Sequence, residues 1–244
     1  MRPEYFHFES VGSTNTAAKE LLRQHDFVFV TADFQTHGRG RNGRSWFGDA
    51  GKNFFCSAAI RHREKKTIEE LLAYQYRACL SVLSVLRKTF PHQCFALKYP
   101  NDVYALEHGK GKKISGVLIE NEFQGERCTT TVIGVGVNLS QRSFPPELED
   151  TATSLLRLGE EISTGTFREK FLPVFQQYLA SGLSDILFHW KHELNLTGKN
   201  IYSLQDRSEY IVQGFDATGR IIAANGDTRR IFDNGDSIRY EVFD

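Results

Sequence analysis

The chain has 244 residues, 40% of them apolar and 25% charged, as in ordinary soluble globular proteins of one large domain or two unequal ones. Thirty basic side chains balance thirty acidic ones, which argues against a protein that wraps nucleic acid through a basic surface. The four cysteines are widely spaced and no apolar run is long enough to cross a bilayer, so we expect a cytoplasmic protein without a zinc site or a membrane segment.

The N-terminal part of the chain predicts a strand, a helix and a hairpin. Phe6 and Phe8 alternate with polar residues as in a short strand, and the polar cluster 13–16 offers N-caps for a helix that follows. Taken alone, this cluster is a helix cap, although helix N-termini also bind anions and polar ligands. Residues 27–34 and 53–60 predict two strands of a hairpin with residues 35–46 at its tip.

The tip of this hairpin alternates three glycines with three arginines in Gln-Thr-His-Gly-Arg-Gly-Arg-Asn-Gly-Arg-Ser-Trp. Glycine loses more conformational freedom on ordering than any other residue, and arginine offers a planar fork of donors that matches carboxylate or phosphate. A solvated basic loop or an arginine-glycine tail for nucleic acid is the alternative, but such tails occur in long low-complexity runs rather than between two strands. We therefore predict a loop that is mobile until an anion orders it.

A long helix and a short strand come next. Thr67 and Glu70 have the spacing of a capping box, and apolar residues at helical intervals continue to about residue 86. Residues 94–99 then predict a strand that ends in the turn 98–102, Lys-Tyr-Pro-Asn-Asp. A plain turn is the default interpretation, but a lysine at a strand end is also where binding sites often collect.

A second hairpin is predicted from residues 103–106 and 114–123, which flank the turn-rich segment 107–113. Lys110 and Lys112 are expected to be solvated.

Glycines mark the strands that follow the turn. Lys113 opens one strand and Gly116 within it would allow a ligand to approach closely. Residues 127–139 predict the next strand, and Gly134 and Gly136 within it weaken that strand unless something must approach. This Gly-x-Gly pair is not a dinucleotide fingerprint, because it lacks a third glycine and a following helix.

The C-terminal part predicts helix and then short strands. Thr166 and Glu169 predict a capping box that opens a helical region reaching about residue 192, with a core-facing aromatic stripe. After Leu194, short β runs alternate with turns, as in a small all-β barrel. We therefore expect a domain over residues 1–194 and a small β-barrel domain over residues 195–244.

Taken together, five motifs in the same order resemble the biotin protein ligases, and the resemblance covers nearly the whole chain. The motifs are Ser13-Thr14-Asn15, Gln35 with Gly38-Arg39-Gly40-Arg41-Asn42-Gly43-Arg44-Ser45-Trp46, Lys98-Tyr99-Pro100-Asn101-Asp102, Lys113-Ile114-Ser115-Gly116 and Gly134-Val135-Gly136-Val137-Asn138. The resemblance implies an α+β fold: a class II synthetase-like catalytic domain with a mixed sheet and packed helices, followed by a small SH3-like β-barrel.

The resemblance also implies roles for individual residues. The biotin pocket would comprise Ser13, Thr14, Asn15, Gln35, Gly38, Arg39 and Gly116. Lys113 would reach the biotin carboxylate and the phosphate that it joins. ATP and the adenylate would be held by Arg41, Arg44, Trp46, Lys98, Asn101 and Asn138, with Gly40 in the same loop. Arg39, Arg44, Lys98 and Lys113 would be the catalytic cations, and no protein metal ligand is expected.

Two positions depart from the family pattern. The family usually has Trp at Tyr99 and often has Arg at Asn42, and neither change removes the resemblance. Many bacterial members carry an N-terminal DNA-binding domain, but the catalytic motifs begin here by Ser13, so we expect a monofunctional enzyme, a monomer or homodimer, that does not bind nucleic acid.

The implied chemistry has two steps. Biotin reacts with ATP, assisted by Mg²⁺, to give biotinyl-5′-AMP and pyrophosphate, and a lysine of a biotin carboxyl carrier domain then attacks the adenylate. Cations are needed where charge develops, and an ordered loop would exclude water from the adenylate. Asp102 is a candidate base for the acceptor lysine or simply a turn residue. The alternatives are a lipoate ligase of the same fold and a non-catalytic anion- or nucleic-acid-binding module.

Overall fold

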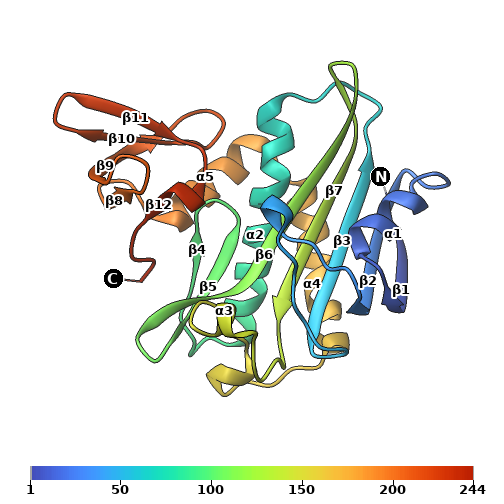
Figure 1. Ribbon diagram of the computed structural model, residues 1–244. Coiled ribbons are helices and arrows are strands. Elements are labelled where there is room, and N and C mark those ends of the chain that lie inside the picture. The colour runs from blue at the N-terminus through green and yellow to red at the C-terminus, as the bar shows by residue number, and fades with distance from the viewer. Residues whose placement is uncertain (1, 244) are drawn as a thin grey trace.

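The computed structural model describes residues 2–243 and is built around a seven-stranded mixed sheet (Figure 1). The strand order is β1-β2-β3-β7-β6-β5-β4. β1 pairs with β2 in parallel and the other neighbours pair antiparallel. The strands are β1 (Glu4–Val11), β2 (Phe27–Gln35), β3 (Asn53–Arg61), β4 (Phe95–Lys98), β5 (Asp102–Glu107), β6 (Lys110–Gln124) and β7 (Arg127–Asn138). The predicted hairpin of β2 and β3 is confirmed.

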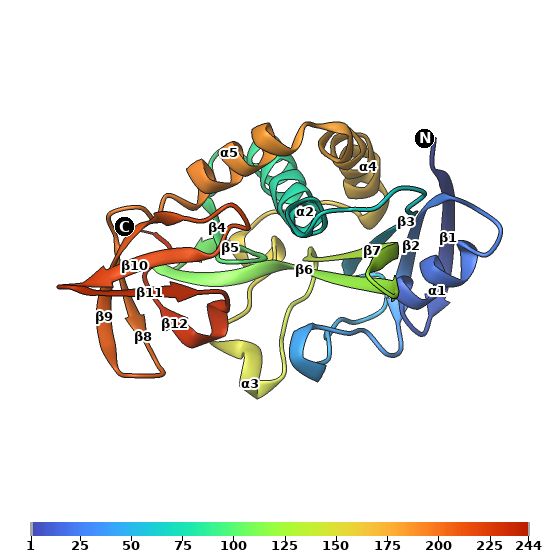
Figure 2. The same cartoon turned by 90° about the horizontal axis from the view of Figure 1, so that it is seen from above.

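Helices cover both faces of this sheet. α2 (Ile68–Thr89), α4 (Thr164–Ala180) and α5 (Leu183–Leu194) lie on one face (Figure 2), whereas α1 (Thr14–Leu21) packs against β2 and β3 on the other. Along β2 the side chains alternate accordingly. Phe27 and Phe29 enter the main core, and Val28 and Val30 enter a smaller core with Ala18 of α1. Within the described residues, no helix is long and apolar enough to span a membrane.

The helix starts follow their capping residues. The predicted capping box of α2 is confirmed, because the Glu70 amide donates to Thr67 Oγ1 at 3.2 Å and the Thr67 amide donates to Glu70 Oε2 at 2.8 Å. The capping box predicted at Thr166 was wrong: the cap of α4 is Ser163, whose hydroxyl accepts from the Thr166 amide at 3.0 Å. The helical region is also two helices, since the chain breaks at Ser181 between α4 and α5.

The second hairpin is tighter than the sequence suggested. Its turn consists of His108 and Gly109, both at positive φ (50° and 77°), and β6 already begins at Lys110. The prediction that Lys112 is solvated was wrong: its side chain is 12% exposed and its ammonium lies 3.0 Å from Glu107 Oε2.

A second, antiparallel sheet of five strands follows α5, in the order β11-β10-β9-β8-β12. Its strands are β8 (Asn200–Ser203), β9 (Ser208–Phe215), β10 (Ile221–Asn225), β11 (Thr228–Phe232) and β12 (Ile238–Arg239). This sheet docks on the first through the β9–β10 turn, where the Tyr76 hydroxyl of α2 donates to the Thr218 carbonyl at 2.8 Å. The Tyr76 ring also stacks on Trp190 of α5, with 3.9 Å between the ring centroids. The expected small β domain corresponds to this sheet, and both its SH3-like class and the boundary at residue 195 stay predictions.

Candidate active site

A cavity of about 410 Å³ lies on the sheet face opposite α2 and α4. β6 and β7 form its floor, and its walls come from the start of α1, the loop after β2, the segment with α3 (Pro146–Glu149), and residues 235–239 of the second sheet. The site residues predicted from sequence that line it are Ser13, Thr14, Asn15, Gln35, Arg39, Gly40, Arg41, Arg44, Trp46, Lys98, Asn101, Lys113, Gly116 and Asn138.

Gly38 is the exception, because it shapes the loop from outside the lining. Its carbonyl accepts from the Trp46 amide at 2.9 Å, and a Cβ at this position would lie only 2.7 Å from the Trp46 carbonyl oxygen. A side chain at Gly38 would therefore push Trp46 out of place.

The arginine loop is folded by its own backbone. The Gly40 amide donates to the Arg44 carbonyl at 2.7 Å, and the Arg44 amide donates to the Arg41 carbonyl at 3.1 Å. Asn42 and Gly43 both have positive φ, 55° and 72°. Asn and Gly are the residues that tolerate this left-handed conformation best, which gives a backbone reason for the asparagine at position 42.

Trp46 explains the glycines of β6 and β7. Gly116 and Gly136 are paired across the two strands, and the indole lies against both. A Cβ on Gly136 would lie 2.5 Å from the indole and one on Gly116 would lie 2.8 Å from it. The space expected above Gly116 for a ligand is thus shared with Trp46 and with the Lys113 ammonium, 2.9 Å from that Cβ position.

A buried polar cluster closes the α1 end of the cavity. Gln35 Oε1 accepts from the Thr14 amide at 2.8 Å and from its hydroxyl at 3.0 Å. Ser57 Oγ lies 2.8 Å from Thr14 Oγ1 and 2.6 Å from Asn15 Oδ1. A Cβ on Gly134 would lie 2.4 Å from that same Asn15 oxygen, so this glycine makes room for the asparagine.

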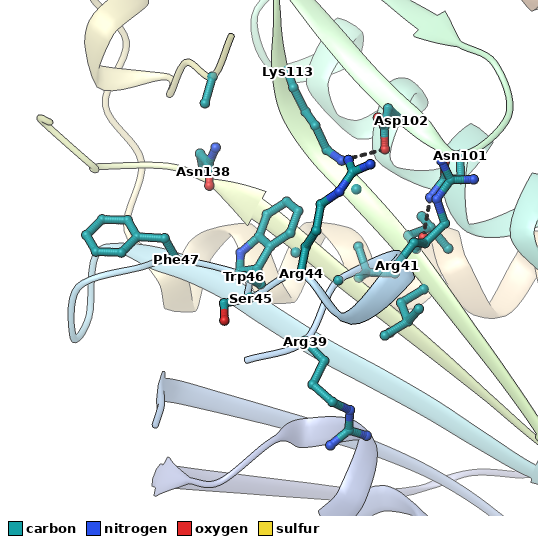
Figure 3. A pocket seen from close by; sticks show the side chains of 18 of the residues that line it. Arg39, Arg41, Arg44, Ser45, Trp46, Phe47, Asn101, Asp102, Lys113 and Asn138 are labelled. Carbon is teal, nitrogen blue, oxygen red and sulfur yellow. Dashed lines mark hydrogen bonds and ion pairs between the residues drawn. The ribbon is translucent and has the colours of Figure 1, made fainter. Parts of the chain in front are cut away.

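Two of the predicted cations are engaged by other groups. Arg39 points away from Trp46 (Figure 3) and forms two hydrogen bonds with the Glu120 carboxylate, at 3.0 and 3.1 Å, and one with Thr16. Lys98 lies over the Tyr104 ring, 4.6 Å from its centroid. Burial lowers the pKa of Lys98, which makes its ammonium easier to deprotonate.

Lys113 enters the cavity beside Asp102. Its Nζ lies 2.7 Å from Asp102 Oδ1 and 5.5 Å from the centre of the Trp46 ring. Asn101 and Asn138 form the adjacent walls: Asn101 Nδ2 donates to the Val117 carbonyl at 2.6 Å and Asn138 Nδ2 to the Thr153 carbonyl at 2.9 Å.

Besides Asp102 Oδ1, whose partner is the Lys113 ammonium, three buried polar atoms of the cavity lining have no hydrogen-bond partner among residues 2–243. They are Trp46 Nε1, Asn101 Oδ1 and Asn138 Oδ1. Buried polar groups are normally paired, so a donor and two acceptors are available to a bound molecule. Within the same described part of the chain, no group of three or more His, Cys, Asp or Glu side chains is arranged to hold a metal ion.

Sequence reasoning missed the contribution of the second sheet. Asp236 and Arg239 line the cavity, and Asp236 Oδ2 lies 3.0 Å from Arg44, 3.6 Å from Arg41 and 3.0 Å from Asn42 Nδ2. Asn-Gly-Asp in a chain of short strands has the pattern of an ordinary turn, so no local signal marks this carboxylate. Phe144, Leu148 and Thr151 of the irregular segment were missed for the same reason.

Comparisons with known proteins agree with this geometry. Residues 7–138 match the model of the Biotin/lipoate A/B protein ligase family. The chain is 30% identical over 190 residues to the bifunctional ligase/repressor BirA of Bacillus spizizenii, a match that covers 74% of this chain and 56% of that protein. It is 28% identical over 222 residues to the biotin--[acetyl-CoA-carboxylase] ligase of Paracoccus denitrificans, covering 86% of this chain and 90% of the other.

A solved structure extends the likeness to the fold. The biotin protein ligase of Aquifex aeolicus in complex with biotin and ATP superposes with a TM-score of 0.76 at 25% identity, covering 97% of each chain. The predicted α+β class is thereby confirmed. The family model spans more than half of the chain, and the chain belongs to the biotin/lipoate A/B protein ligase family.

Proposed function

We propose that the chain is a biotin protein ligase, which activates biotin with ATP to biotinyl-5′-AMP, releases pyrophosphate, and transfers biotin to a lysine of a biotin carboxyl carrier domain. One observation carries the proposal. The cavity lining holds six cationic side chains against two carboxylates, although the chain as a whole is neutral. The cations are Arg39, Arg41, Arg44, Lys98, Lys113 and Arg239.

The cavity also suits a substrate with one polar head, an apolar middle and an acidic end. The cluster of Thr14, Asn15 and Gln35 offers both donors and acceptors for a cyclic urea. The indole of Trp46 gives an apolar surface in the middle, and the Lys113 ammonium lies beyond it. This sequence of surfaces matches the ureido ring, the thioether ring and the carboxylate of biotin.

The first step brings a carboxylate to a triphosphate, so negative charge accumulates in a small volume. Lys113 is placed to neutralise the carboxylate and the α-phosphate as they join, which stabilises the transition state more than the separate reactants. Arg41, Arg44 and Arg239 lie on the side of the second sheet, where the remaining phosphates would bind. Mg²⁺ bound to the phosphates would supply further charge neutralisation.

In the second step the acceptor lysine must reach the adenylate while water stays out. Arg41 and Arg44 connect the arginine loop to Asp236, and an ordered loop that lines the cavity would shield the mixed anhydride from water. Asp102 was a candidate base for the acceptor lysine. Its pairing with Lys113 at 2.7 Å favours a role in orienting that lysine instead.

The family includes lipoate ligases, so the substrate needs a direct test. We expect biotin to support ATP–pyrophosphate exchange and lipoate to leave it at background, followed by biotin transfer to a carrier domain. Exchange that depends on lipoate alone would replace the proposal by lipoate ligase. Exchange with neither acid would favour a non-catalytic binding module. The cytoplasm, where ATP and carrier domains occur together, is the proposed location.

A further inference from the structure

At Lys113, the strand β6 is no longer paired with its neighbour β7. β7 pairs with β6 as far as Ser115, which lies opposite Val137. Beyond that point the segment after β7 takes its place: the Lys113 amide donates to the Thr151 carbonyl at 2.8 Å, and the Thr153 amide donates to the Lys113 carbonyl at 2.9 Å. Lys113 is therefore held on this side by an irregular segment rather than by a strand of the sheet.

The other side of Lys113 is also irregular. On β5, Val103 lies opposite Ser115 but its neighbour Tyr104 lies opposite Lys113, so the register shifts by one residue. Such a bulge bends the strand and re-aims the side chains next to it. The direction of Lys113 thus depends on how firmly the bulged hairpin and the irregular segment are fixed to each other.

Four charged side chains fix the bulged hairpin to the irregular segment. Glu107 of the hairpin lies 2.9 Å from Arg157 and 3.0 Å from Lys112, and Arg157 also lies 2.6 Å from Glu149. Glu149 Oε2 accepts from the Phe144 amide at 3.1 Å, and Lys112 donates to the Glu149 carbonyl at 3.3 Å. Glu107 and Lys112 belong to the hairpin, whereas Glu149 and Arg157 flank residues 151–153.

The network is built to persist. The Glu107 side chain is 4% exposed, yet both of its oxygens face a cation. Burial alone would raise the pKa of Glu107, but the hydrogen bonds from Lys112 and Arg157 outweigh it and hold the pKa below its usual value. Removing one partner of a buried pair leaves an uncompensated charge, so the link would fail rather than weaken gradually.

We propose that Glu107 and Arg157 are positioning residues for Lys113, because their ion pair clamps residues 151–153 against the hairpin and so sets the direction of the lysine in the cavity. Neither Glu107 nor Arg157 lines the cavity, so the clamp acts on Lys113 from outside it. Its kinetic role rests on the proposed function, whereas its structural role does not.

The test compares Glu107→Gln and the milder Glu149→Gln with wild type in two assays. In hydrogen–deuterium exchange, we expect faster exchange of the Lys113 and Thr153 amides and unchanged protection of β2 and β3. In biotin-dependent pyrophosphate exchange, we expect kcat to fall roughly 10- to 100-fold for Glu107→Gln, as for a misplaced catalytic group, with KM for ATP within about threefold of wild type. Glu149→Gln should show smaller changes in the same direction.

Glu193→Gln is the matched control, since it removes an arginine–glutamate pair of 2.7 Å between α2 and α5, outside the cavity. In the control, both kcat and the exchange rates of the Lys113 and Thr153 amides should equal those of wild type. Loss of protection throughout the sheet, or a kcat equal to wild type despite faster exchange at Lys113, would overturn the proposal. If wild type shows no exchange with biotin, the proposed function fails, while the amide measurement still decides whether the clamp holds Lys113.

Discussion

Asp236 and Arg44 join the second sheet to the arginine loop, with 3.0 Å between the carboxylate and the guanidinium. Arg41 lies 3.6 Å from the same oxygen. The Asp236 side chain is 34% exposed and that of Arg44 is 66% exposed, and such surface pairs contribute roughly 0–1 kcal/mol each. A triphosphate carries more negative charge than one carboxylate, so it can replace Asp236 as the ion-pair partner of Arg41 and Arg44.

Asp236→Ala is expected to loosen the loop without unfolding the protein. Loss of about 0.5–1 kcal/mol of ion-pair stabilisation corresponds to roughly two- to fivefold more of the opened loop. Opening of the loop exposes its arginines, and trypsin cleaves after exposed arginines. Limited tryptic digestion, with the cleavage sites identified by mass spectrometry, should show faster cutting after Arg41 and Arg44 by that factor. ATP with biotin should restore protection in the variant.

Asp227→Ala is the control, because Asp227 is an exposed residue in the turn between β10 and β11. Its loop cleavage should match wild type. Equal cleavage rates in Asp236→Ala and wild type would show that the carboxylate does not hold the loop.

Gly136→Ala is expected to displace Trp46. The added Cβ would lie 2.5 Å from the indole, a distance that forces movement, and overpacking of this kind typically costs about 1–3 kcal/mol. Because Trp46 belongs to a loop, we expect the ring to move toward solvent. The other tryptophan, Trp190, is fully buried, so acrylamide quenching of fluorescence reports mainly on Trp46 and should increase.

A helical glycine provides the comparison for this substitution. A Cβ on Gly165 would have its nearest neighbour at 3.9 Å, so Gly165→Ala should leave quenching unchanged. If quenching in Gly136→Ala equals that of wild type, the indole does not rest on the glycine pair.

Much of the fold followed from local patterns. The capping box of Thr67 and Glu70 predicted the start of α2. The β-rich run 27–34 predicted the strand β2, which the structure shows to be buried on both faces. The start of α4 was misplaced because Ser163 and Thr166 are both capable caps, and only packing chooses between them.

The site was predictable where its residues belong to continuous motifs and not elsewhere. Arg39, Lys113 and Asn138 could be named because each lies in such a motif. The partners that orient them, Glu120 for Arg39 and Thr153 for Asn138, are distant in sequence or lie in irregular segments, where no periodicity reports position. Asp236 was missed for the same reason, since its carboxylate reaches the loop only after the second sheet docks.

Lys113→Met should abolish most of the first step. A positioned donor that stabilises developing charge contributes roughly 10²- to 10³-fold in rate, and methionine keeps much of the side-chain length without the charge. Biotin-dependent ATP–pyrophosphate exchange should fall by at least that factor. Lys110→Met, at an exposed position of the same strand, should be close to wild type. Near-normal exchange in Lys113→Met would show that the role is misassigned.

Asp216 makes the β9–β10 turn sensitive to acid. Burial opposes ionisation of this carboxyl, but hydrogen bonds from Thr218 and Arg220 outweigh it and lower its pKa to about 2. A group whose pKa is lower in the folded than in the unfolded state stabilises the fold above its unfolded pKa, and this contribution is lost as the pH falls through the folded value. The turn docks on Tyr76, so the second sheet should loosen in acid.

Asp216→Asn tests this in urea unfolding at pH 7, 4 and 3. At pH 7 the variant should be less stable by about 1–2 kcal/mol, a figure reduced for solvent screening because the side chain is 19% exposed. The difference should persist at pH 4 and shrink to roughly half near pH 3, since the wild-type carboxylate then gains protons on unfolding. A difference that stays constant from pH 7 to pH 3 would mean that the ionised carboxylate does not stabilise the turn.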